Sequence, residues 1–291
     1  MPFLVACIGI ATFAGMDAVM KELAIALGAY NAMLWRTGAA LLMAATLFLL
    51  SRSTWPPLAT IKLHVWRGLV TSVMAYLFFW GLIYVPIAEA IALTFIAPLI
   101  ALYLAAWQLG ESVGRQSVLA SCVGFLGGLV ILSGKLAGDY NEQVWLGIGA
   151  ILGSAVLYAY NLILQRRQAL IAKPVEIALF QNLTVVGTYS LLAPFFAVIP
   201  ESALADELIL AAALGLVSMM LLSWAYARAE ARVLIPVEYT AFAWAALLGW
   251  LMFDESLTWP TLLGTGLIVT GCLMSAYSGR KEIDHVETTA L

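Results

Sequence analysis

Residues 87–112 read IAEAIALTFIAPLIALYLAAWQLGES. From Ile87 to Leu109 the apolar residues do not alternate with polar ones, so every face of a helix built from this stretch is apolar. At about 1.5 Å per residue, such a helix crosses the roughly 30 Å of hydrocarbon in a bilayer. The stretch therefore predicts a membrane-spanning helix, which Gly110-Glu111-Ser112 brings to an end.

The rest of the chain repeats this pattern. Of its 291 residues, 63% are hydrophobic and 11% are charged, whereas soluble domains carry about 25% charged residues. The lack of alternation excludes an outer-membrane barrel. We expect an all-α polytopic membrane protein of ten transmembrane helices, with loops too short for a soluble catalytic domain. The other predicted helices are Phe3–Leu23, Tyr30–Leu50, Trp66–Val85, Val113–Leu132, Val144–Leu164, Val175–Val198, Leu208–Ala227, Val233–Phe253 and Trp259–Tyr277.

Basic residues indicate the orientation, because positively charged loops stay on the cytoplasmic side. With the N-terminus inside, only Lys21, Arg36 and Lys135 lie toward the outer side. We therefore expect both termini in the cytoplasm and a bacterial-type cytoplasmic (inner) membrane. The basic residues on the expected inner side are Arg52, Lys62, Arg67, Arg115, Arg166, Arg167, Lys173, Arg228, Arg232, Arg280 and Lys281.

The motif at the end of the quoted stretch recurs in the second half of the chain. Gly110-Glu111-Ser112 returns as Asp254-Glu255-Ser256, 144 residues later, and the same offset aligns Trp80 with Trp224. Five helices per copy is an odd number, so the second copy is inverted relative to the first. Inverted repeats build transporters whose site lies near mid-membrane between the copies. We predict repeats at 1–135 and 136–279 around a central cavity, and a cytoplasmic tail at 280–291.

Several classes of function are excluded. The net charge of −3 leaves no basic surface for nucleic acid. The three cysteines have no CxxC spacing, and no Walker motif is present, so we expect no metal, no other cofactor and no direct use of ATP. A membrane-embedded protease is also disfavoured, because His64 is expected in a loop, His285 in the tail, and Asp17 is the one aspartate well inside a span. The chain is thus predicted not to be an enzyme.

With these features the sequence resembles the EamA family of the drug/metabolite transporter superfamily, over its whole length. The resemblance implies ten helices around a central cavity and a substrate such as an amino acid, a nucleoside, a cationic drug or S-adenosylmethionine. Phe242 departs from the family, since many members have proline there, and Glu238 stands where smaller or apolar residues are commoner. The resemblance rests on both acidic helix ends, Trp35-Arg36-Thr37-Gly38, Ala97-Pro98-Leu99, and Pro236 through Leu248-Gly249-Trp250 to Phe253-Asp254-Glu255.

Charged residues inside a bilayer indicate either pairing or function. Asp17 and Arg36 lie at similar depths in the first two predicted helices, so we expect them to approach as an ion pair; Lys21 is a competing partner. That pair is either a structural bridge or part of a substrate or proton site. Glu238 has no basic partner within its own helix. It suits proton coupling or the anchoring of a cationic substrate, unless it is a hydrogen-bonded structural glutamate. Glu89 is expected at the interface, and Glu111 and Glu255 in structural roles.

Aromatic residues form a second candidate set. Tyr76, Trp80 and Tyr84 share one helical face. Trp80 and Trp224 lie in opposite halves of the membrane, and they either wall the cavity from both ends or pack against helices and lipid. Pro98 and Pro236 each free a carbonyl one turn earlier and are candidate hinges. The remaining candidates for the cavity wall are Thr94, Tyr158, Asn161, Gln181 and Tyr239.

The leading interpretation is a carrier that works by alternating access. Its partners are expected to be a small-molecule substrate and membrane lipid, with proton coupling and plain facilitated exchange both open, as a monomer or a homodimer. Export of amino acids or related metabolites is the first choice of substrate class. An organic-cation or S-adenosylmethionine-type carrier is the alternative, and a channel or lipid scramblase is the competing class.

Overall fold

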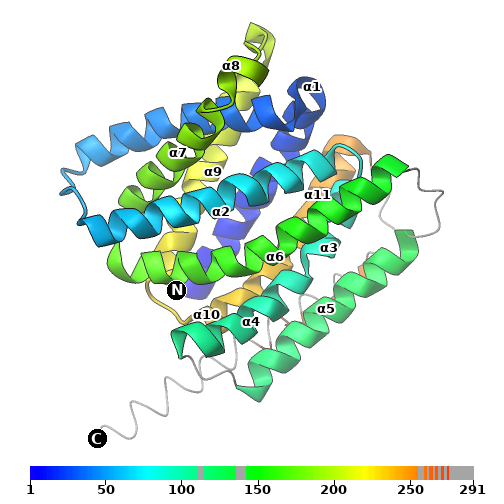
Figure 1. Cartoon of the computed structure of the whole chain (residues 1–291). Coiled ribbons are helices and arrows are strands. Elements are labelled where there is room, and N and C mark those ends of the chain that lie inside the picture. The colour runs from blue at the N-terminus through cyan, green and yellow to red at the C-terminus, as the bar shows by residue number, and fades with distance from the viewer. Residues whose placement is uncertain are drawn as a thin grey trace, which may run out of the picture.

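The computed structural model describes residues 1–110, 114–135 and 142–254, together with 259–260, 262–264, 266–267, 270–271 and 274. Every regular element in these residues is helical (Figure 1). The elements are α1 Pro2–Leu50, α2 Leu58–Leu82, α3 Ile87–Thr94, α4 Ile96–Leu109, α5 Arg115–Lys135, α6 Glu142–Ile171, α7 Pro174–Ser190, α8 Ala193–Phe196, η1 Ser202–Leu204, α9 Ala205–Tyr226, α10 Ala231–Leu234, η2 Ile235–Tyr239 and α11 Thr240–Phe253.

This all-helical architecture agrees with the predicted class. In the described part of the chain, six helices are long and apolar enough to cross a membrane, some of them assembled from consecutive elements. Several residues of the sequence analysis lie outside the described residues. They are Glu111, Glu255, Cys272, His285, the tail 280–291, and the side chains of Glu89 and Pro236.

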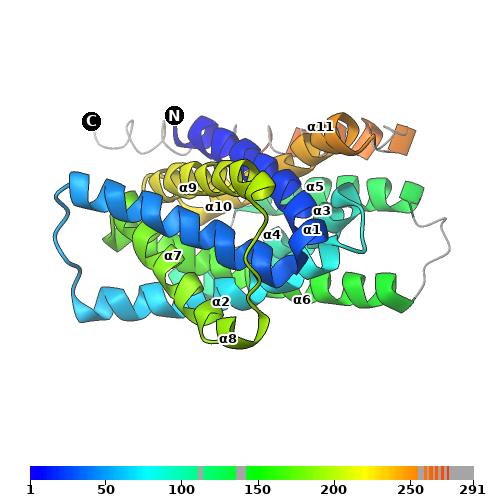
Figure 2. The same cartoon turned by 90° about the horizontal axis from the view of Figure 1, so that it is seen from above.

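The first two predicted helices are the two arms of α1. Gly28 joins them without a loop and has φ 76° and ψ 150°, while the residues on either side stay helical. Glycine adopts a positive φ at little cost because it has no Cβ. The resulting bend is visible where α1 changes direction (Figure 2). The first arm therefore continues past the predicted end at Leu23, and the bend at Gly28 lies two residues before the predicted start of the second helix at Tyr30.

Element boundaries repeat along the chain at the predicted offset. Phe95 and Tyr239 are 144 residues apart; each immediately precedes a 14-residue helix, α4 or α11. Each of those helices is followed by a left-handed residue, Gly110 at φ 67° or Asp254 at φ 51°. The hydroxyl of Tyr239 also donates to the Phe95 carbonyl across 3.2 Å. The boundaries of these elements thus match at the offset of 144 residues, while the inverted repeat stays a prediction.

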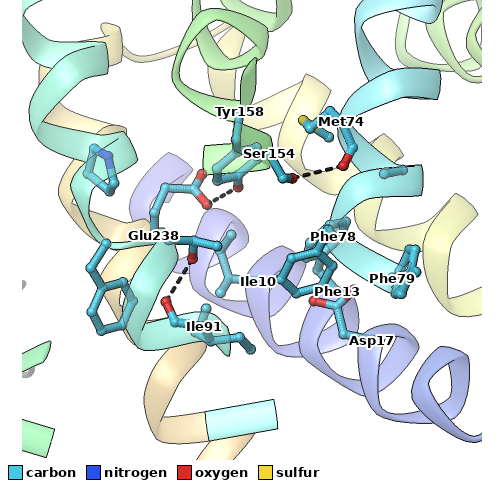
Figure 3. A pocket seen from close by; sticks show the side chains of 15 residues that line it. Ile10, Phe13, Asp17, Met74, Phe78, Phe79, Ile91, Ser154, Tyr158 and Glu238 are labelled. Atoms are coloured by element: carbon cyan, nitrogen blue, oxygen red, sulfur yellow. Dashed lines mark hydrogen bonds between the residues drawn. The ribbon is translucent and has the colours of Figure 1, made fainter. Parts of the chain in front are cut away.

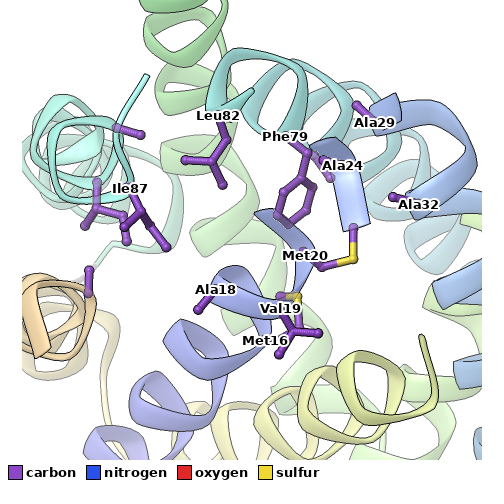
Figure 4. Close-up of a cluster of buried hydrophobic side chains, with 14 of the residues drawn as sticks. Met16, Ala18, Val19, Met20, Ala24, Ala29, Ala32, Phe79, Leu82 and Ile87 are labelled. Carbon is purple, nitrogen blue, oxygen red and sulfur yellow. The ribbon is translucent and has the colours of Figure 1, made fainter. Parts of the chain in front are cut away.

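The two halves of the chain interlock instead of standing apart. α1 packs most extensively against α9, and α2 against α6, so each half contributes one helix to each pair. The largest apolar cluster draws buried side chains from both halves of the chain, and includes Met16, Met20, Phe79, Leu82 and Ile87 from α1, α2 and α3 (Figure 4). This cluster holds the first arm of α1 against the end of α2.

Both spans that carry the predicted hinge prolines are interrupted. The span that contains Pro98 is broken at Phe95, three residues before the proline, which separates α3 from α4. The span that contains Pro236 is broken by the 3₁₀ segment Ile235–Tyr239, which separates α10 from α11. Proline lacks a backbone N–H and cannot complete the hydrogen bond of the preceding turn. The interruptions lie where the sequence predicted them, whereas hinge motion stays a prediction.

Candidate functional site

A cavity lies between elements from both halves of the chain (Figure 3). Five of the predicted site residues line it: Asp17 from α1, Thr94 from α3, Pro98 from α4, Tyr158 from α6 and Glu238 from η2. The structure thus brings together residues that are up to 221 positions apart in the sequence. The other lining residues are Ile10, Phe13, Met74, Ala75, Phe78, Phe79, Ile91, Phe95, Ser154 and Ala241.

Glu238 is held in the cavity wall by two tyrosines. Its side chain is almost fully buried. The hydroxyl of Tyr158 donates to Oε2 across 2.5 Å, and the hydroxyl of Tyr226 lies 3.4 Å from Oε1. Figure 3 shows the carboxylate and the Tyr158 hydroxyl pointing toward one another. Among the described residues, the hydrogen-bond partners of this carboxylate are therefore neutral hydroxyls.

Asp17 has a different environment. It is 3% exposed, and its Oδ1 has no hydrogen-bond partner among the described residues. Phe13 and Phe78 lie beside it in the cavity (Figure 3). A buried carboxylate oxygen without a partner is energetically unfavourable. Asp17 is therefore free to accept a proton or a cationic group of a ligand.

The predicted ion pair between Asp17 and Arg36 does not form in this structure. The two charges interact electrostatically, but no basic nitrogen of a described residue lies within 4.0 Å of the Asp17 carboxylate. Arg36 instead directs Nη2 toward Met33 Sδ at 3.6 Å and packs against Gly215. The ammonium of Lys21 lies 4.9 Å from the centre of the Phe253 ring. The directions of the two side chains therefore differ from those that the ion pair would need.

The predicted tryptophan walls lie outside the described cavity. Trp80 packs edge-on against Tyr84 at 5.2 Å, and Trp224 lies 4.1 Å below the guanidinium of Arg228. Tyr76 is 38% exposed and does not line the cavity either. The aromatic wall is formed by Phe13, Phe78, Phe79 and Phe95 together with Tyr158. Sequence reasoning missed the phenylalanines because they are ordinary constituents of apolar runs.

This arrangement leads to a test of the aromatic residues. We expect Trp80→Ala and Trp224→Ala to leave the KM for transport within about twofold of the wild-type value, because neither ring faces the cavity. Phe78→Ala should raise the KM by about tenfold, since Phe78 lines the cavity and a stacked aromatic contact contributes about 0.5–1.5 kcal/mol beyond its buried area. Initial rates in proteoliposomes measure both effects. A rise in KM for the tryptophan variants, with Phe78→Ala unchanged, would restore the original assignment.

The three other predicted wall residues are buried away from the cavity. The hydroxyl of Tyr239 donates to the Phe95 carbonyl, as described above. Asn161 accepts hydrogen bonds from Arg67 at 3.0 Å and from Thr71 at 3.2 Å. Gln181 is 2% exposed, and its Oε1 has no hydrogen-bond partner in the described structure. None of these three side chains lines the described cavity.

A buried polar cluster beside the cavity was not predicted. His64, expected in a loop, lies within α2 and is fully buried, with Gln168 at 2.8 Å and Glu176 at 3.1 Å from its ring nitrogens. Arg67, expected at the inner interface, is also buried. Asn161, Gln165 and Gln168 share one face of α6, but the predicted helix Val144–Leu164 ended before the two glutamines, so the sequence analysis missed this polar face. The cluster joins α2 to α6 and α7.

Comparison with known proteins gives the fold an independent reference. A solved crystal structure matches this one with a TM-score of 0.73 and 20% sequence identity, over 96% of both chains. At that identity the match establishes the fold alone. It agrees with the all-helical bundle described above.

Curated relatives are transporters by name. A riboflavin transporter of Rhizobium johnstonii is 31% identical over 74% of this chain and 72% of its own length. An S-adenosylmethionine uptake transporter of Rickettsia prowazekii is 25% identical over 76% and 73%, respectively. A pseudopaline exporter of Pseudomonas aeruginosa is 25% identical over 93% of this chain and 94% of its own length.

The family match covers nearly all of the chain. The sequence model of the EamA-like transporter family matches the chain twice, over residues 1–133 and over residues 145–277. Together with the apolar helices, the match identifies an integral membrane protein of the transporter class. The chain belongs to the EamA-like transporter family, within the drug/metabolite transporter superfamily.

Proposed function

We propose that this protein is a secondary carrier for small organic cations, particularly those that join a positive group to a flat ring. The observation that carries the proposal is the composition of the cavity wall. It contains two buried carboxylates, Asp17 and Glu238, together with aromatic rings, and none of the fifteen described lining residues is basic. In the proposed carrier, two inverted five-helix repeats make ten spans in a cytoplasmic membrane, with both termini inside.

The charge of the cavity favours a cation over the amino acids that the sequence first suggested. A zwitterionic amino acid brings a carboxylate that needs a positively charged or N–H partner, and the polar groups here are two carboxylates and three hydroxyls. All three of those hydroxyls already donate elsewhere: Thr94 to the Ile91 carbonyl, Ser154 to the Met74 carbonyl and Tyr158 to Glu238. A cation gains both an ionic contact and the faces of the phenylalanine rings.

The names of the relatives support a flat, partly cationic solute. Riboflavin carries a flat tricyclic ring, and S-adenosylmethionine joins a sulfonium cation to adenine. Those substrates belong to the relatives; here they guide the choice of compounds. Because the relatives include an uptake carrier and an exporter, both directions of flux are to be measured.

The two carboxylates support different roles. Asp17 has an unpartnered oxygen and is proposed to hold the cationic group of the solute. Glu238 is hydrogen-bonded to two hydroxyls, and we assign it to proton coupling. When Glu238 is ionised, both of its oxygens accept hydrogen bonds. When it is protonated, one oxygen donates and the other still accepts, so both forms can hydrogen-bond to the tyrosine hydroxyls without a shift of the tyrosines. Two separate sites allow solute and proton to be exchanged during one transport cycle.

Counterflow in proteoliposomes tests this function. We expect saturable exchange of a permanently charged aromatic cation such as methyl viologen. S-adenosylmethionine, whose amino-acid carboxylate has no basic partner among the lining residues, and neutral riboflavin should exchange more weakly, with leucine or glutamate at background. Empty liposomes are the control. Saturable counterflow confined to amino acids would overturn the cation assignment, whereas flux linear in concentration, without counterflow, would indicate a channel.

A further inference from the structure

Hydrogen bonds join α2 to α6 along one half of their interface. The pair lies side by side in Figure 1. Beginning at the cavity, Ser154 donates to the Met74 carbonyl at 2.8 Å. About one turn farther along α2, and two turns along α6, Thr71 donates to Asn161 at 3.2 Å. The side-chain contacts then continue through Arg67 toward the end of the bundle where α2 begins and α6 stops.

Arg67 is the centre of this interface. It is 4% exposed, and its guanidinium donates in three directions: from Nε to Asn161 at 3.0 Å, from Nη2 to Gln165 at 2.7 Å and from Nη1 to Gln168 at 2.6 Å. All three acceptors are amide oxygens of α6, which belongs to the other half of the chain. An arginine buried inside a membrane protein is unfavourable unless its donors are satisfied. Here one side chain ties the two halves together.

The opposite end of the same interface is built differently. At Gly81 the two helices approach so closely that a Cβ there would lie 2.7 Å from the Gly147 carbonyl oxygen. Close backbone packing through small residues is a typical membrane-helix contact and needs no polar groups. The interface therefore has a tight glycine contact at one end, the cavity near its middle, and the polar contacts of Arg67 at the other end.

We propose that Arg67 is the gate residue that closes the cavity toward the connection between α6 and α7. The inference rests on the alternating access proposed above. In the closed arrangement Arg67 binds α6; opening requires these hydrogen bonds to break while the contact at Gly81 and Gly147 is retained. The fixed positive charge of Arg67 also opposes the leakage of cations past the gate, as arginine does in selective pores. His64 extends the closed region, through Gln168, to Glu176 on α7.

Cysteine accessibility tests the gate without a solute. In a chain whose native cysteines are replaced, Ala241→Cys provides a reporter in the cavity wall on α11, away from the polar contacts. Lys173→Cys, between α6 and α7, identifies the gated face in sealed vesicles. With a membrane-impermeant methanethiosulfonate cation, we expect Arg67→Met to raise the labelling rate of the reporter about tenfold from that face and to lower it from the other.

Two further variants separate gating from general loosening. Ser72→Ala is the matched control, because Ser72 is buried in α2 but donates within its own helix, to the Gly68 carbonyl. It should leave both labelling rates unchanged. Gln165→Met removes one of the three acceptors of Arg67. It should shift the labelling rates in the same direction as Arg67→Met, by about threefold. This second variant keeps the test possible if the Arg67 variant does not assemble. Unchanged rates in the Gln165 variant, or an equal rise from both faces, would overturn the proposal. Failure here leaves the solute class untouched, because no transport is measured.

Discussion

Glu238→Gln is expected to abolish solute accumulation driven by a proton gradient while leaving solute exchange without a gradient close to the wild-type rate. Glutamine keeps an oxygen that accepts the hydrogen bond from Tyr158, so the local geometry persists. It cannot release or take up a proton, and coupling is lost. Burial inside the helix bundle and the absence of a basic partner in the described structure make this carboxylate suited to cycling between neutral and charged forms.

The measurement compares two assays on the same proteoliposomes. Accumulation after an imposed pH step should fall to the level of protein-free liposomes, and should no longer vary with pH, while counterflow at equal pH continues. Glu230→Gln is the control, because Glu230 pairs with Arg232 and is far more exposed. Retention of gradient-driven accumulation by the Glu238 variant would show that this glutamate is a structural, hydrogen-bonded residue.

Much of the architecture could be predicted because it depends on patterns local in sequence. Hydropathy located the apolar helices, and the interruptions appear beside the prolines, three residues before Pro98 and around Pro236. The depth of a charge within its helix likewise follows from counting residues. Asp17 and Glu238, selected only as charges inside apolar runs, line the same cavity.

The errors arose where the rotation of a helix decides the outcome. Trp80 was placed at a plausible depth, yet its ring packs against Tyr84, while the neighbouring residues Phe78 and Phe79 face the cavity. The environment of Arg67 depends on residues of α6 that are 94 to 101 positions away. Single-sequence patterns carry no information about such distant partners. The position of Gly28 also shows that two predicted spans can be arms of one element.

Asp17→Asn provides the second large effect, a loss of affinity confined to charged solutes. We expect the half-saturating concentration for organic cations to rise about 30-fold, because losing one partner of a buried charge pair costs about 2 kcal/mol or more. Asparagine has nearly the same shape, so a neutral flat solute such as riboflavin should change by no more than about twofold. Competition for counterflow by both compounds measures this difference on one preparation.

Thermal stability separates a binding role for Asp17 from a structural one. In the unliganded protein the buried Oδ1 lacks a hydrogen-bond partner among the described residues, and its charge is poorly solvated. Removing the charge should therefore leave the melting temperature unchanged or raise it, as is common where a site sacrifices stability for function. Asp206→Asn, at an exposed position near the start of α9, is the control. If Asp17 were a structural residue, its loss would lower the melting temperature. It would also lower the affinity for cationic and neutral solutes alike. If Asp17→Asn lowers the affinity for cations without lowering the melting temperature, Asp17 binds the ligand and is not a structural residue.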